Sequence, residues 1–288
     1  MSAQILDGKL LAQQLQVELK AEVDALRIRT GKVPRFMNIT IGQDPSACSY
    51  GKSQKKAAEF IGIDYQFSNL SQHVSQKELM DQIHFLNDDV NVHGIMLHKP
   101  VPDGIDFQLA VNAITPKKDI EGMNIANLGR LMLGTTNIIP ATPAAAMALL
   151  VSSGVDLAGK DAVLIGRSEI VGKPMMLLLL EKNLTVTVCH SGTSKAGRLE
   201  DHVRKAEILV VAMGRPGCVK GEWLREGAIV IDVGINLVDG KLVGDVEFDA
   251  AAKRASFITP VPGGVGPVTA VMLMKNGIET FKIQLEHP

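Results

Sequence analysis

Hydrophobic residues in the first third of the chain recur at helical and then at strand-like spacing. From Gly8 to Leu26 they fall mostly three or four residues apart, which predicts an amphipathic helix. A β-prone run follows from Arg35 to Ile41, and Gly42 to Pro45 has the composition of a turn. The helical pattern returns from Ser46 to Phe60 and ends at Gly62. The pattern indicates helix, strand and helix in succession.

The same alternation repeats in the next segment. Tyr65 to Leu70 reads as a strand, Ser75 to Leu86 as a helix with a serine cap, and Val92 to Leu97 as another strand. Alternating strands and helices predict a parallel sheet. Ligands bind at the carboxyl ends of such strands, so the loop that follows Leu97, residues 98–102, is a candidate site.

A second alternating block occupies the rest of the chain. Its expected strands are Ala162–Gly166, Thr185–Cys189, Ile208–Met213, Ala228–Val233 and Phe257–Val261. Between the two blocks we expect a helix over Ile120–Leu133, a turn at Pro140–Pro143 and a helix over Ala144–Val151. The fold class is therefore α/β, with two α/β units joined through residues 120–154.

The segment from Ile258 to Thr269 contains three prolines and three glycines. Proline fixes φ, glycine admits a positive φ and a close approach of ligand to backbone, and Pro267 suits the first turn of a helix. The segment is either a ligand loop or a rigid connector to a terminal helix from about Val268. The density of both residue types favours the ligand loop.

The segment Val163 to Pro174 runs from an apolar strand through a turn into an apolar helix, as at the phosphate turn of a dinucleotide-binding unit. Ser168 stands where the strict glycine pattern has its second glycine. After Gly166, backbone donors near Ile170 still form an anion site, although a plain strand-to-helix turn has the same pattern. These residues are compatible both with a cofactor-binding turn and with a plain strand-to-helix turn.

Two features at this turn concern the choice of cofactor. The next strand ends at Cys189-His190-Ser191 without a carboxylate to hold a ribose 2′-hydroxyl, and Arg167 lies at the turn itself. This combination predicts NADP rather than NAD. Small residues at two further strand ends, Gly214 and Gly234, are expected to border the nicotinamide together with residues 263–266.

Composition narrows the class of protein. The 288 residues are 46% hydrophobic and 21% charged, with a net charge of -1, which is ordinary for a globular protein and unlike a nucleic-acid-binding one. Cys48, Cys189 and Cys218 lack metal or redox spacing and are expected to be buried thiols in a reducing compartment. No signal peptide or membrane-length apolar run is present, so we expect a cytoplasmic protein. The cysteine spacing gives no indication of a metal site, and we expect none.

Several motifs together resemble one family, that of the bifunctional methylenetetrahydrofolate dehydrogenase/methenyltetrahydrofolate cyclohydrolases (FolD-type). The motifs are Ile5–Gly8, Lys55–Glu59, Lys117–Gly122, Gly166–Pro174, Gly227–Asn236 and Ile258–Thr269. The resemblance implies two α/β domains around a folate cleft: residues 1–122 plus 270–288 for folate, and 123–269 as a Rossmann-like NADP-binding domain. It also implies a homodimer, and the oxidation of 5,10-methylenetetrahydrofolate followed by hydrolysis of the methenyl product.

The resemblance also implies roles for single residues. Tyr50 matches a tyrosine that stacks on the folate ring system. The expected substrate-binding residues are Tyr50, His98, Pro100, Glu121, Gly263 and Gly264. The expected cofactor-binding residues are Gly166, Arg167, Ser168, Ile170, Ser191, Gly214, Gly234, Ile235 and Thr269, with Arg167 and Ser191 at positions that contact the 2′-phosphate.

The chain departs from the family pattern at the expected catalytic residues, Tyr50, Gln54, His98, Lys99 and Glu121. Gln54 replaces the principal catalytic lysine, and an amide neither carries charge nor transfers a proton near neutral pH. His98-Lys99 stands for Gln-Leu, and Glu121 for an aspartate. Either His98 and Lys99 rebuild the site around the missing lysine, or His98 only fills space and Lys99 points to solvent.

Three functions are therefore under consideration. The first is an NADP-dependent methylenetetrahydrofolate dehydrogenase whose cyclohydrolase step is weak or lost, because hydride transfer depends chiefly on positioning. The second is a diverged enzyme for another pterin-like substrate. The third is a cofactor-binding pseudoenzyme.

Overall fold

The computed structural model describes residues 2–42 and 45–286, and the side chains of all of these except 45–49. The chain forms two compact units, which we describe separately. Unit 1 comprises Met1–Ala12 and Thr142–Thr269, and unit 2 comprises Gln13–Ala141 and Ala270–Pro288. The domain boundaries expected from the sequence stay a prediction. The center of the expected Gly42–Pro45 turn and the Cys48 thiol lie outside the described residues.

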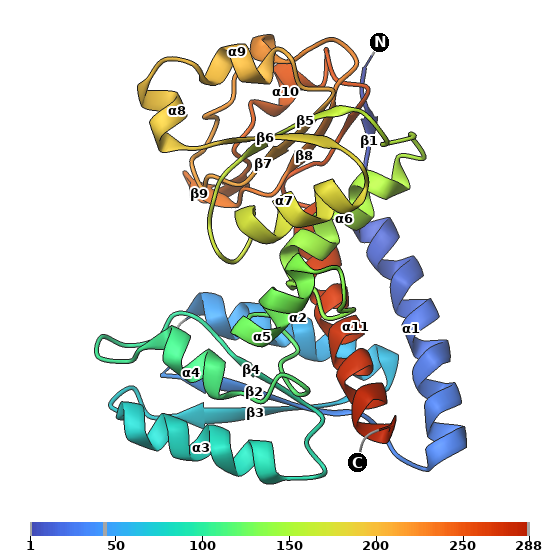
Figure 1. The fold of residues 1–288 in the computed structure, drawn as a ribbon, viewed down its shortest axis with the longest axis vertical. Coiled ribbons are helices and arrows are strands. Elements are labelled where there is room, and N and C mark those ends of the chain that lie inside the picture. Colours follow the sequence, from blue (N-terminus) through green and yellow to red (C-terminus); the bar gives the residue numbers. More distant parts are fainter. Residues whose placement is uncertain (1, 43–44, 287–288) are drawn as a thin grey trace. The chain divides into compact units, whose positions relative to one another are not determined.

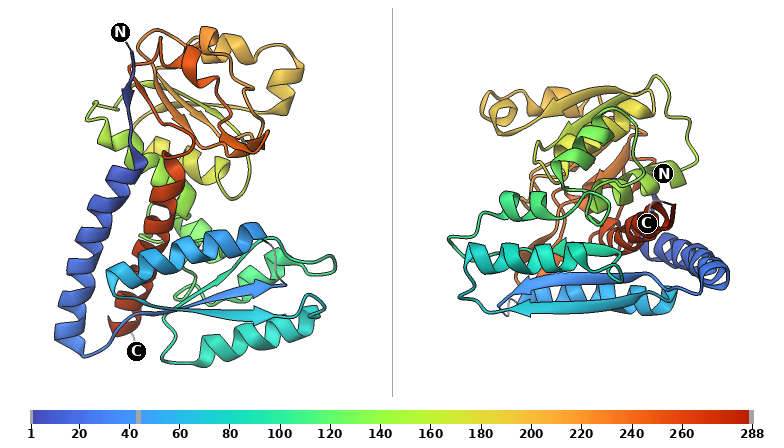
Figure 2. Two further views of the ribbon diagram at one scale, coloured as in Figure 1. Left: turned by 180° about the vertical axis from the view of Figure 1, so that it is seen from behind. Right: turned by 60° about the horizontal axis from the view of Figure 1, so that its bottom comes forward.

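Unit 2 contains a three-stranded parallel sheet in the order β3-β2-β4. Its strands are β2 (Arg35–Ile41), β3 (Asp64–Leu70) and β4 (Gly94–Leu97). Its helices are α2 (Pro45–Ile61), α3 (Gln76–Asp88), α4 (Phe107–Ala113) and α5 (Ile125–Met132), with most of α1 (Gly8–Thr30) and α11 (Val265–Glu286). Figures 1 and 2 show α2 on one face of the sheet and α3 on the other.

The central strand β2 and the strand β4 carry buried side chains on both faces, and both faces of the sheet are covered. Ile39 and Ile41 pack with Leu79 and Ile83 of α3 in one buried cluster. On the other face lies Phe36, fully buried, and glycines admit its ring: a Cβ at Gly94 would come within 2.8 Å of it. The cap of α3 is the predicted one, since Ser75 and Glu78 form a reciprocal capping box.

Unit 1 contains a six-stranded parallel sheet in the order β6-β5-β7-β8-β11-β1. Its strands are β1 (Gln4–Ile5), β5 (Asp161–Ile165), β6 (Thr185–Cys189), β7 (Ile208–Val211), β8 (Ile229–Asp232) and β11 (Phe257–Ile258). The order reverses between β5 and β7, which makes this a doubly wound, dinucleotide-type sheet with its ligand crevice expected at that switch point. The predicted Rossmann-like class is confirmed.

Short helices and a hairpin complete unit 1. The helices are α6 (Ala141–Ser152), α7 (Gly172–Glu181), α8 (Ser191–Lys195), α9 (Leu199–Val203), η1 (Gly221–Trp223) and α10 (Phe248–Ala251). Figure 1 shows α6 and α7 on one side of the sheet and α9 and α10 on the other, where they cover a buried apolar cluster. Strands β9 (Asn236–Val238) and β10 (Lys241–Val243) pair as an antiparallel hairpin.

Most predicted elements are confirmed, and three are wrong. The helix expected over Ile120–Leu133 begins only at Ile125, because Asp119 bridges to β4 and Gly122 adopts a φ of 70°. The turn expected at Pro140–Pro143 lies largely inside α6, and the strand expected up to Val261 ends at Ile258. Cys189 is buried as expected, whereas Cys218 is partly exposed. No helix within the described residues is long and apolar enough to cross a membrane.

Candidate functional site

The first group of predicted site residues lies at the carboxyl edge of the unit 2 sheet. Its order, β3-β2-β4, places the switch point between β2 and β4. His98, Lys99 and Pro100 leave β4 at this edge, and the His98 N–H donates to the carbonyl of Ile39 on β2 at 2.9 Å. The sequence-based placement of residues 98–102 at a strand end is thus confirmed.

Tyr50 and Gln54 lie one turn apart on α2, so they share a helix face. The Tyr50 side chain is 38% exposed, and its ring centroid lies 6.1 Å from that of His98 at an interplanar angle of 45°. The structure therefore brings Tyr50 and His98 together. The lysines beside Gln54, namely Lys52, Lys55 and Lys56, are exposed, and Lys55 pairs with Glu59 at 4.0 Å, away from that face.

Gln54 is buried and hydrogen-bonded within the unit. Its Oε1 accepts from the Tyr65 hydroxyl at 2.9 Å, and that hydroxyl accepts from Asn38 Nδ2, also at 2.9 Å. Gln54 Oε1 also lies 3.5 Å from Asn38 Nδ2. Burial raises the pKa of Tyr65 well above its ordinary value, so the hydroxyl keeps its proton. Gln54 therefore belongs to a hydrogen-bonded network with Tyr65 and Asn38 in which no side chain carries a charge.

Glu121 lies in a turn that Asp119 holds in place. The buried Asp119 carboxylate accepts from the backbone N–H groups of Gly122 and Asn124 and from Asn127 Nδ2, at 2.8 to 3.0 Å. Burial raises the pKa of Asp119 despite these donors. Burial, and then the charge of Asp119, raise the pKa of Glu121 to about 8, while Lys99 opposes the shift. Glu121 is therefore largely protonated near neutral pH.

Lys99 combines features of both alternatives left open by the sequence. Its side chain is exposed, and its Nζ lies 4.0 Å from the centroid of the Phe107 ring, a cation–π contact. Its charge nevertheless acts on Glu121. Lys99 thus supplies a positive potential at the edge where Glu121 lies, from the loop after β4 with its ammonium over Phe107 of α4, rather than from position 54.

The second group of predicted residues lies at the carboxyl edge of the unit 1 sheet. Gly166 ends β5 with a φ of 136°, and a Cβ there would lie 2.4 Å from the Ala212 carbonyl oxygen. Arg167, Ser168 and Ile170 follow and are exposed. The Ser168 hydroxyl accepts from the N–H groups of residues 171 and 172, so these two donors already have a partner within the turn.

The neighbouring strand, β6, ends at Cys189 without a carboxylate side chain, as the sequence indicates. The Gly166 N–H donates to the Cys189 carbonyl at 2.9 Å, which brings the ends of β5 and β6 side by side. His190 Nδ1 accepts from the Gly192 N–H and caps α8, and Ser191 is exposed at the start of that helix. Arg167 and Ser191 thus follow adjacent strand ends within one unit.

The predicted glycines at the ends of β7 and β8 take part in a carboxylate network that sequence reasoning missed. The buried Asp245 carboxylate accepts from the N–H groups of residues 213, 214 and 215. Asp232 accepts from the Gly234 N–H at 2.9 Å, and burial raises its pKa to about 6. A Cβ at Gly234 would lie 2.2 Å from the Asp245 carboxyl carbon. Internal packing therefore requires glycine at position 234, whereas a Cβ at Gly214 would meet nothing within 4 Å and only its φ of 63° favours glycine. Contact of either glycine with a cofactor stays a prediction.

The loop of residues 258–269 is shaped by contacts within unit 1. Gly263 has a φ of 111°, and its carbonyl accepts from the Gly8 N–H at 2.9 Å. A Cβ at Gly264 would lie 2.6 Å from the Pro260 carbonyl oxygen. Thr269 donates its hydroxyl to the Val265 carbonyl inside α11, and Ile235 is 54% exposed. Asp7 caps α1 through the N–H groups of residues 9 and 10. Gly8 and the loop thus fit each other.

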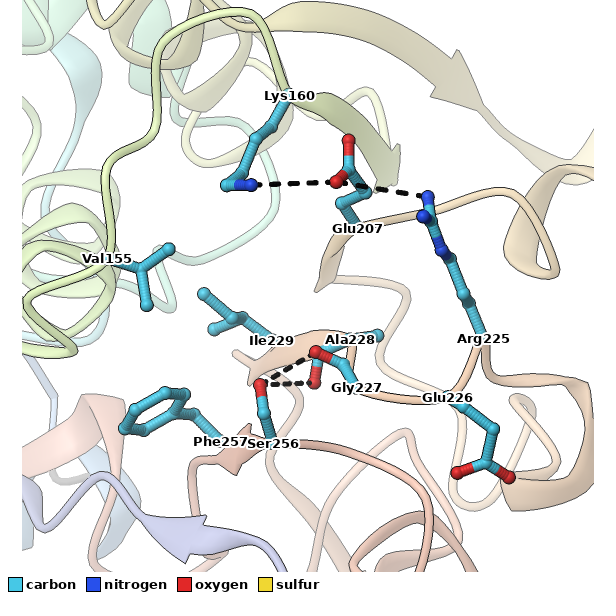
Figure 3. A pocket seen from close by; sticks show the side chains of 10 residues that line it. All are labelled: Val155, Lys160, Glu207, Arg225, Glu226, Gly227, Ala228, Ile229, Ser256 and Phe257. Atoms are coloured by element: carbon cyan, nitrogen blue, oxygen red, sulfur yellow. Dashed lines mark hydrogen bonds and ion pairs between the residues drawn. The ribbon is translucent and has the colours of Figure 1, made fainter.

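A pocket of about 290 Å³ also lies in unit 1, and none of the predicted residues lines it. Figure 3 shows Lys160 and Arg225 on either side of Glu207, at 3.6 and 3.9 Å from its carboxylate, above the apolar side chains of Val155 and Phe257. These residues lie at the amino ends of the strands, opposite the switch point. The pocket is not part of the candidate site.

Sequence reasoning missed Asn38 and Tyr65, although a signal was present. Asn38 is a polar residue in an otherwise apolar central strand, and Tyr65 is one of only two tyrosines. A buried amide requires a partner, so these two residues could have been paired. Asp232 and Asp245 gave no such signal because most of their partners are backbone N–H groups, the exception being Asn236 Nδ2 on Asp245.

Comparison with known proteins gives a consistent result. Residues 6–121 match the model of the tetrahydrofolate dehydrogenase/cyclohydrolase catalytic domain, and residues 140–285 that of its NAD(P)-binding domain. The chain is 49% identical to the bifunctional protein FolD 2 of Myxococcus xanthus, over 97% of this chain and 96% of that protein. It is 46% identical to the bifunctional protein FolD of Acetivibrio thermocellus, over 99% of both.

Solved structures agree with these matches. The bifunctional FolD methylenetetrahydrofolate dehydrogenase/cyclohydrolase of Campylobacter jejuni superposes with a TM-score of 0.94 at 40% identity, over 98% of this chain and 99% of that one. The Trypanosoma brucei enzyme, whose structure contains NADP cofactor and an inhibitor, gives a TM-score of 0.94 at 40% identity, over 99% of both chains.

Proposed function

Because this chain belongs to the tetrahydrofolate dehydrogenase/cyclohydrolase family, we propose that it is an NADP-dependent 5,10-methylenetetrahydrofolate dehydrogenase whose cyclohydrolase step is weak. Relatives that are 49% and 46% identical over nearly the full length are bifunctional FolD proteins. The observation that carries the second half of the proposal is Gln54, a buried amide bonded to Tyr65. Neither the diverged-substrate alternative nor the pseudoenzyme alternative has support from these relatives.

The proposed folate site lies on the unit 2 edge. Tyr50 offers an exposed aromatic face for the ring system, with His98 beside it. Glu121 accepts or donates hydrogen bonds to the ring according to its protonation state, and Pro100 limits the edge beyond His98. The substrate-binding role expected for Gly263 and Gly264, which lie in unit 1, stays a prediction. These roles rest on position and chemistry.

The residues of unit 1 fit NADP. The exposed turn after Gly166 and the adjacent start of α8 present Arg167 and Ser191, and β6 ends without a carboxylate to repel a 2′-phosphate. Gly166, Ser168, Ile170, Gly214, Gly234, Ile235 and Thr269 are the other proposed cofactor residues. When bound, NADP supplies the acceptor for a hydride from the bridging carbon of the folate, and the protein's part is to orient the two.

The two chemical steps place different demands on the chain. Oxidation of the methylene carbon releases a hydride and requires alignment of the substrate, which Tyr50 and His98 can provide. Hydrolysis of the methenyl product adds water and requires a group that moves a proton. Gln54 cannot do this, and Glu121 is one ionisable side chain that the edge retains. The dehydrogenase step is therefore retained and the hydrolytic step is slowed.

An assay with both nicotinamide cofactors tests the proposal. The protein is incubated with 5,10-methylenetetrahydrofolate and either NADP or NAD, and the reduced cofactor and methenyl chromophore are followed together. We expect reduction of NADP with accumulation of the methenyl product. If neither NADP nor NAD is reduced, the proposed dehydrogenase activity is refuted. If NAD is reduced as efficiently as NADP, only the proposed cofactor preference is refuted.

We also propose that the protein is a homodimer formed through unit 1, as the sequence resemblance implies. The β9–β10 hairpin supports this, because Leu237, Val238 and Leu242 are 72%, 38% and 45% exposed on it. A short antiparallel hairpin with an apolar surface is typical of a strand edge that pairs with a second copy. Sedimentation of the wild type and of Leu237→Lys tests this. The cytoplasmic location expected from the sequence remains a prediction.

A further inference from the structure

Three polar side chains from three different elements of unit 2 meet in the interior. Asn38 lies on β2, Tyr65 on β3 and Gln54 on α2, and they are 0%, 4% and 3% exposed. The Tyr65 hydroxyl lies 2.9 Å from both amides. We call Asn38, Tyr65 and Gln54 the amide–tyrosine network. It occupies the position at which the sequence lacks a proton-transferring residue.

The hydrogen bonds of this network run in one direction. Asn38 Nδ2 donates to the Tyr65 oxygen, and the Tyr65 hydroxyl donates to Gln54 Oε1. In the opposite direction Gln54 would donate to the Tyr65 oxygen and the Tyr65 hydroxyl would donate to Asn38, so both side-chain amides would have to be rotated by about 180°. Asn38 Nδ2 would then occupy the present position of its Oδ1, which is buried and has no hydrogen-bond partner. Burying two unpaired N–H groups costs more free energy than leaving one carbonyl unpaired, so the observed direction is favoured.

This direction determines which end of the Gln54 amide is committed. Its carbonyl oxygen is held by Tyr65, so its NH₂ group is left to point away from that hydroxyl. Gln54 shares a helix face with Tyr50, and the charge of Glu121 acts on the Tyr65 hydroxyl. The network therefore lies beneath the edge formed by Tyr50, His98 and Glu121.

We propose that Tyr65 and Asn38 are positioning residues that hold Gln54 as a neutral hydrogen-bond donor to the folate. This inference rests on the proposed function. Gln54 then aligns the substrate for hydride transfer through its NH₂ group, which donates to an acceptor nitrogen or oxygen of the bound folate. The network stabilises one rotamer and one orientation of the amide, and no proton is transferred.

The test is a double-mutant cycle with Tyr65→Phe and Gln54→Met in the full-length protein. Tyr65→Phe removes the hydroxyl and keeps the ring, which packs edge-on against Phe67 at 5.5 Å. Each single variant is expected to lower the kcat of NADP reduction with methylenetetrahydrofolate about tenfold, as for one lost neutral hydrogen bond, and the double variant no further. A network that only supports the fold would lower the melting temperature and leave kcat unchanged.

Ser68→Ala is the matched control. Ser68 lies on the same strand, and its hydroxyl is likewise hydrogen-bonded to a glutamine amide: it accepts from Gln82 Nε2 of α3 at 3.3 Å. Its kcat should equal that of the wild type. Multiplicative losses in the double variant, or a folded Tyr65→Phe protein with wild-type kcat and KM, would overturn the proposal.

A second readout separates this proposal from the function on which it rests. If the wild type does not oxidise methylenetetrahydrofolate, the proposed function fails, and binding of tetrahydrofolate is then measured by titration calorimetry. Equal and non-additive losses of tetrahydrofolate affinity in Tyr65→Phe and Gln54→Met would still support the positioning role. Unchanged affinity in both would overturn it.

Discussion

Replacing Gln54 with lysine should restore a proton-transferring group at the place where the chain lacks one. The ammonium would lie beside the Tyr65 oxygen, which is 2.9 Å from the present Gln54 oxygen. It would also be able to use Asn38 Oδ1, a buried acceptor without a partner, if that amide turns. Two acceptors and the nearby Glu121 carboxyl compensate for burying the charge.

The expected size of the effect follows from electrostatics. An ammonium beside the Tyr65 oxygen would act on Glu121 as an opposite charge, and at an effective dielectric constant of about 20 a unit charge about 6 Å away is worth about 2.8 kcal/mol. The pKa of Glu121, now about 8, would therefore fall, so that more of this side chain is ionised at pH 7.5 and pairs with the ammonium. General acid–base catalysis contributes about 10²- to 10⁴-fold, so hydrolysis should rise at least about 100-fold.

The assay follows the decay of purified methenyltetrahydrofolate at pH 7.5 with wild type, Gln54→Lys and Ser53→Lys. Ser53→Lys is the matched control because it adds the same charge to the neighbouring, exposed position of α2. Only Gln54→Lys should accelerate hydrolysis, while NADP reduction stays within a few-fold of the wild type. The reasoning is refuted if a folded Gln54→Lys protein hydrolyses no faster, or if Ser53→Lys accelerates hydrolysis equally.

Three further predictions follow from other parts of the structure. Folding raises the pKa of Glu121 from 4.5 to about 8, so the stability that protonated Glu121 contributes is lost as pH rises through this range. The melting temperature of Glu121→Gln minus that of the wild type should therefore increase between pH 5 and pH 8. A difference that stays constant over this range would contradict the prediction. Arg167→Ala should raise the KM for NADP about tenfold and leave the KM for NAD unchanged. In the control variant Lys182→Ala, at the far end of α7, both KM values should stay at the wild-type level. Equal effects of Arg167→Ala on both cofactors would show that Arg167 does not bind the 2′-phosphate. Gly264→Ala should destabilise the protein by about 2 kcal/mol or more in denaturant unfolding, because its Cβ would lie 2.6 Å from a carbonyl oxygen, whereas Gly266→Ala, with 3.9 Å to its nearest neighbour, should be nearly neutral.

The sequence predicted those parts of the fold that depend on local patterns. The alternation of strands and helices, the Ser75 cap and the apolar strands of both sheets were recognisable because each depends on residues close together in the chain. The turn from Asp119 to Asn124 was mistaken for helix, since its conformation depends on a buried carboxylate that accepts backbone N–H groups. Short elements such as α4 and the β9–β10 hairpin carry too little periodicity to be recognised.

The sequence predicted where the candidate site residues lie in the fold better than it predicted their hydrogen-bond partners and burial. The family resemblance grouped Tyr50, Gln54 and His98, and the structure places Tyr50 near His98 and on the same helix face as Gln54. The partners of Gln54 come from two other strands, so Tyr65 and Asn38 could not be assigned to it from spacing. The raised pKa of Glu121 likewise depends on burial and on Asp119, which are properties of the folded unit.

The most direct test of the account is the ratio of two rates in the wild-type protein. The rate of NADPH formation from methylenetetrahydrofolate is compared with the rate at which the protein hydrolyses methenyltetrahydrofolate, corrected for the uncatalysed reaction in the same buffer. The account predicts steady NADPH formation with a matching accumulation of methenyltetrahydrofolate, since Gln54 transfers no proton. Hydrolysis that keeps pace with NADPH formation, so that no methenyl product accumulates, would contradict it.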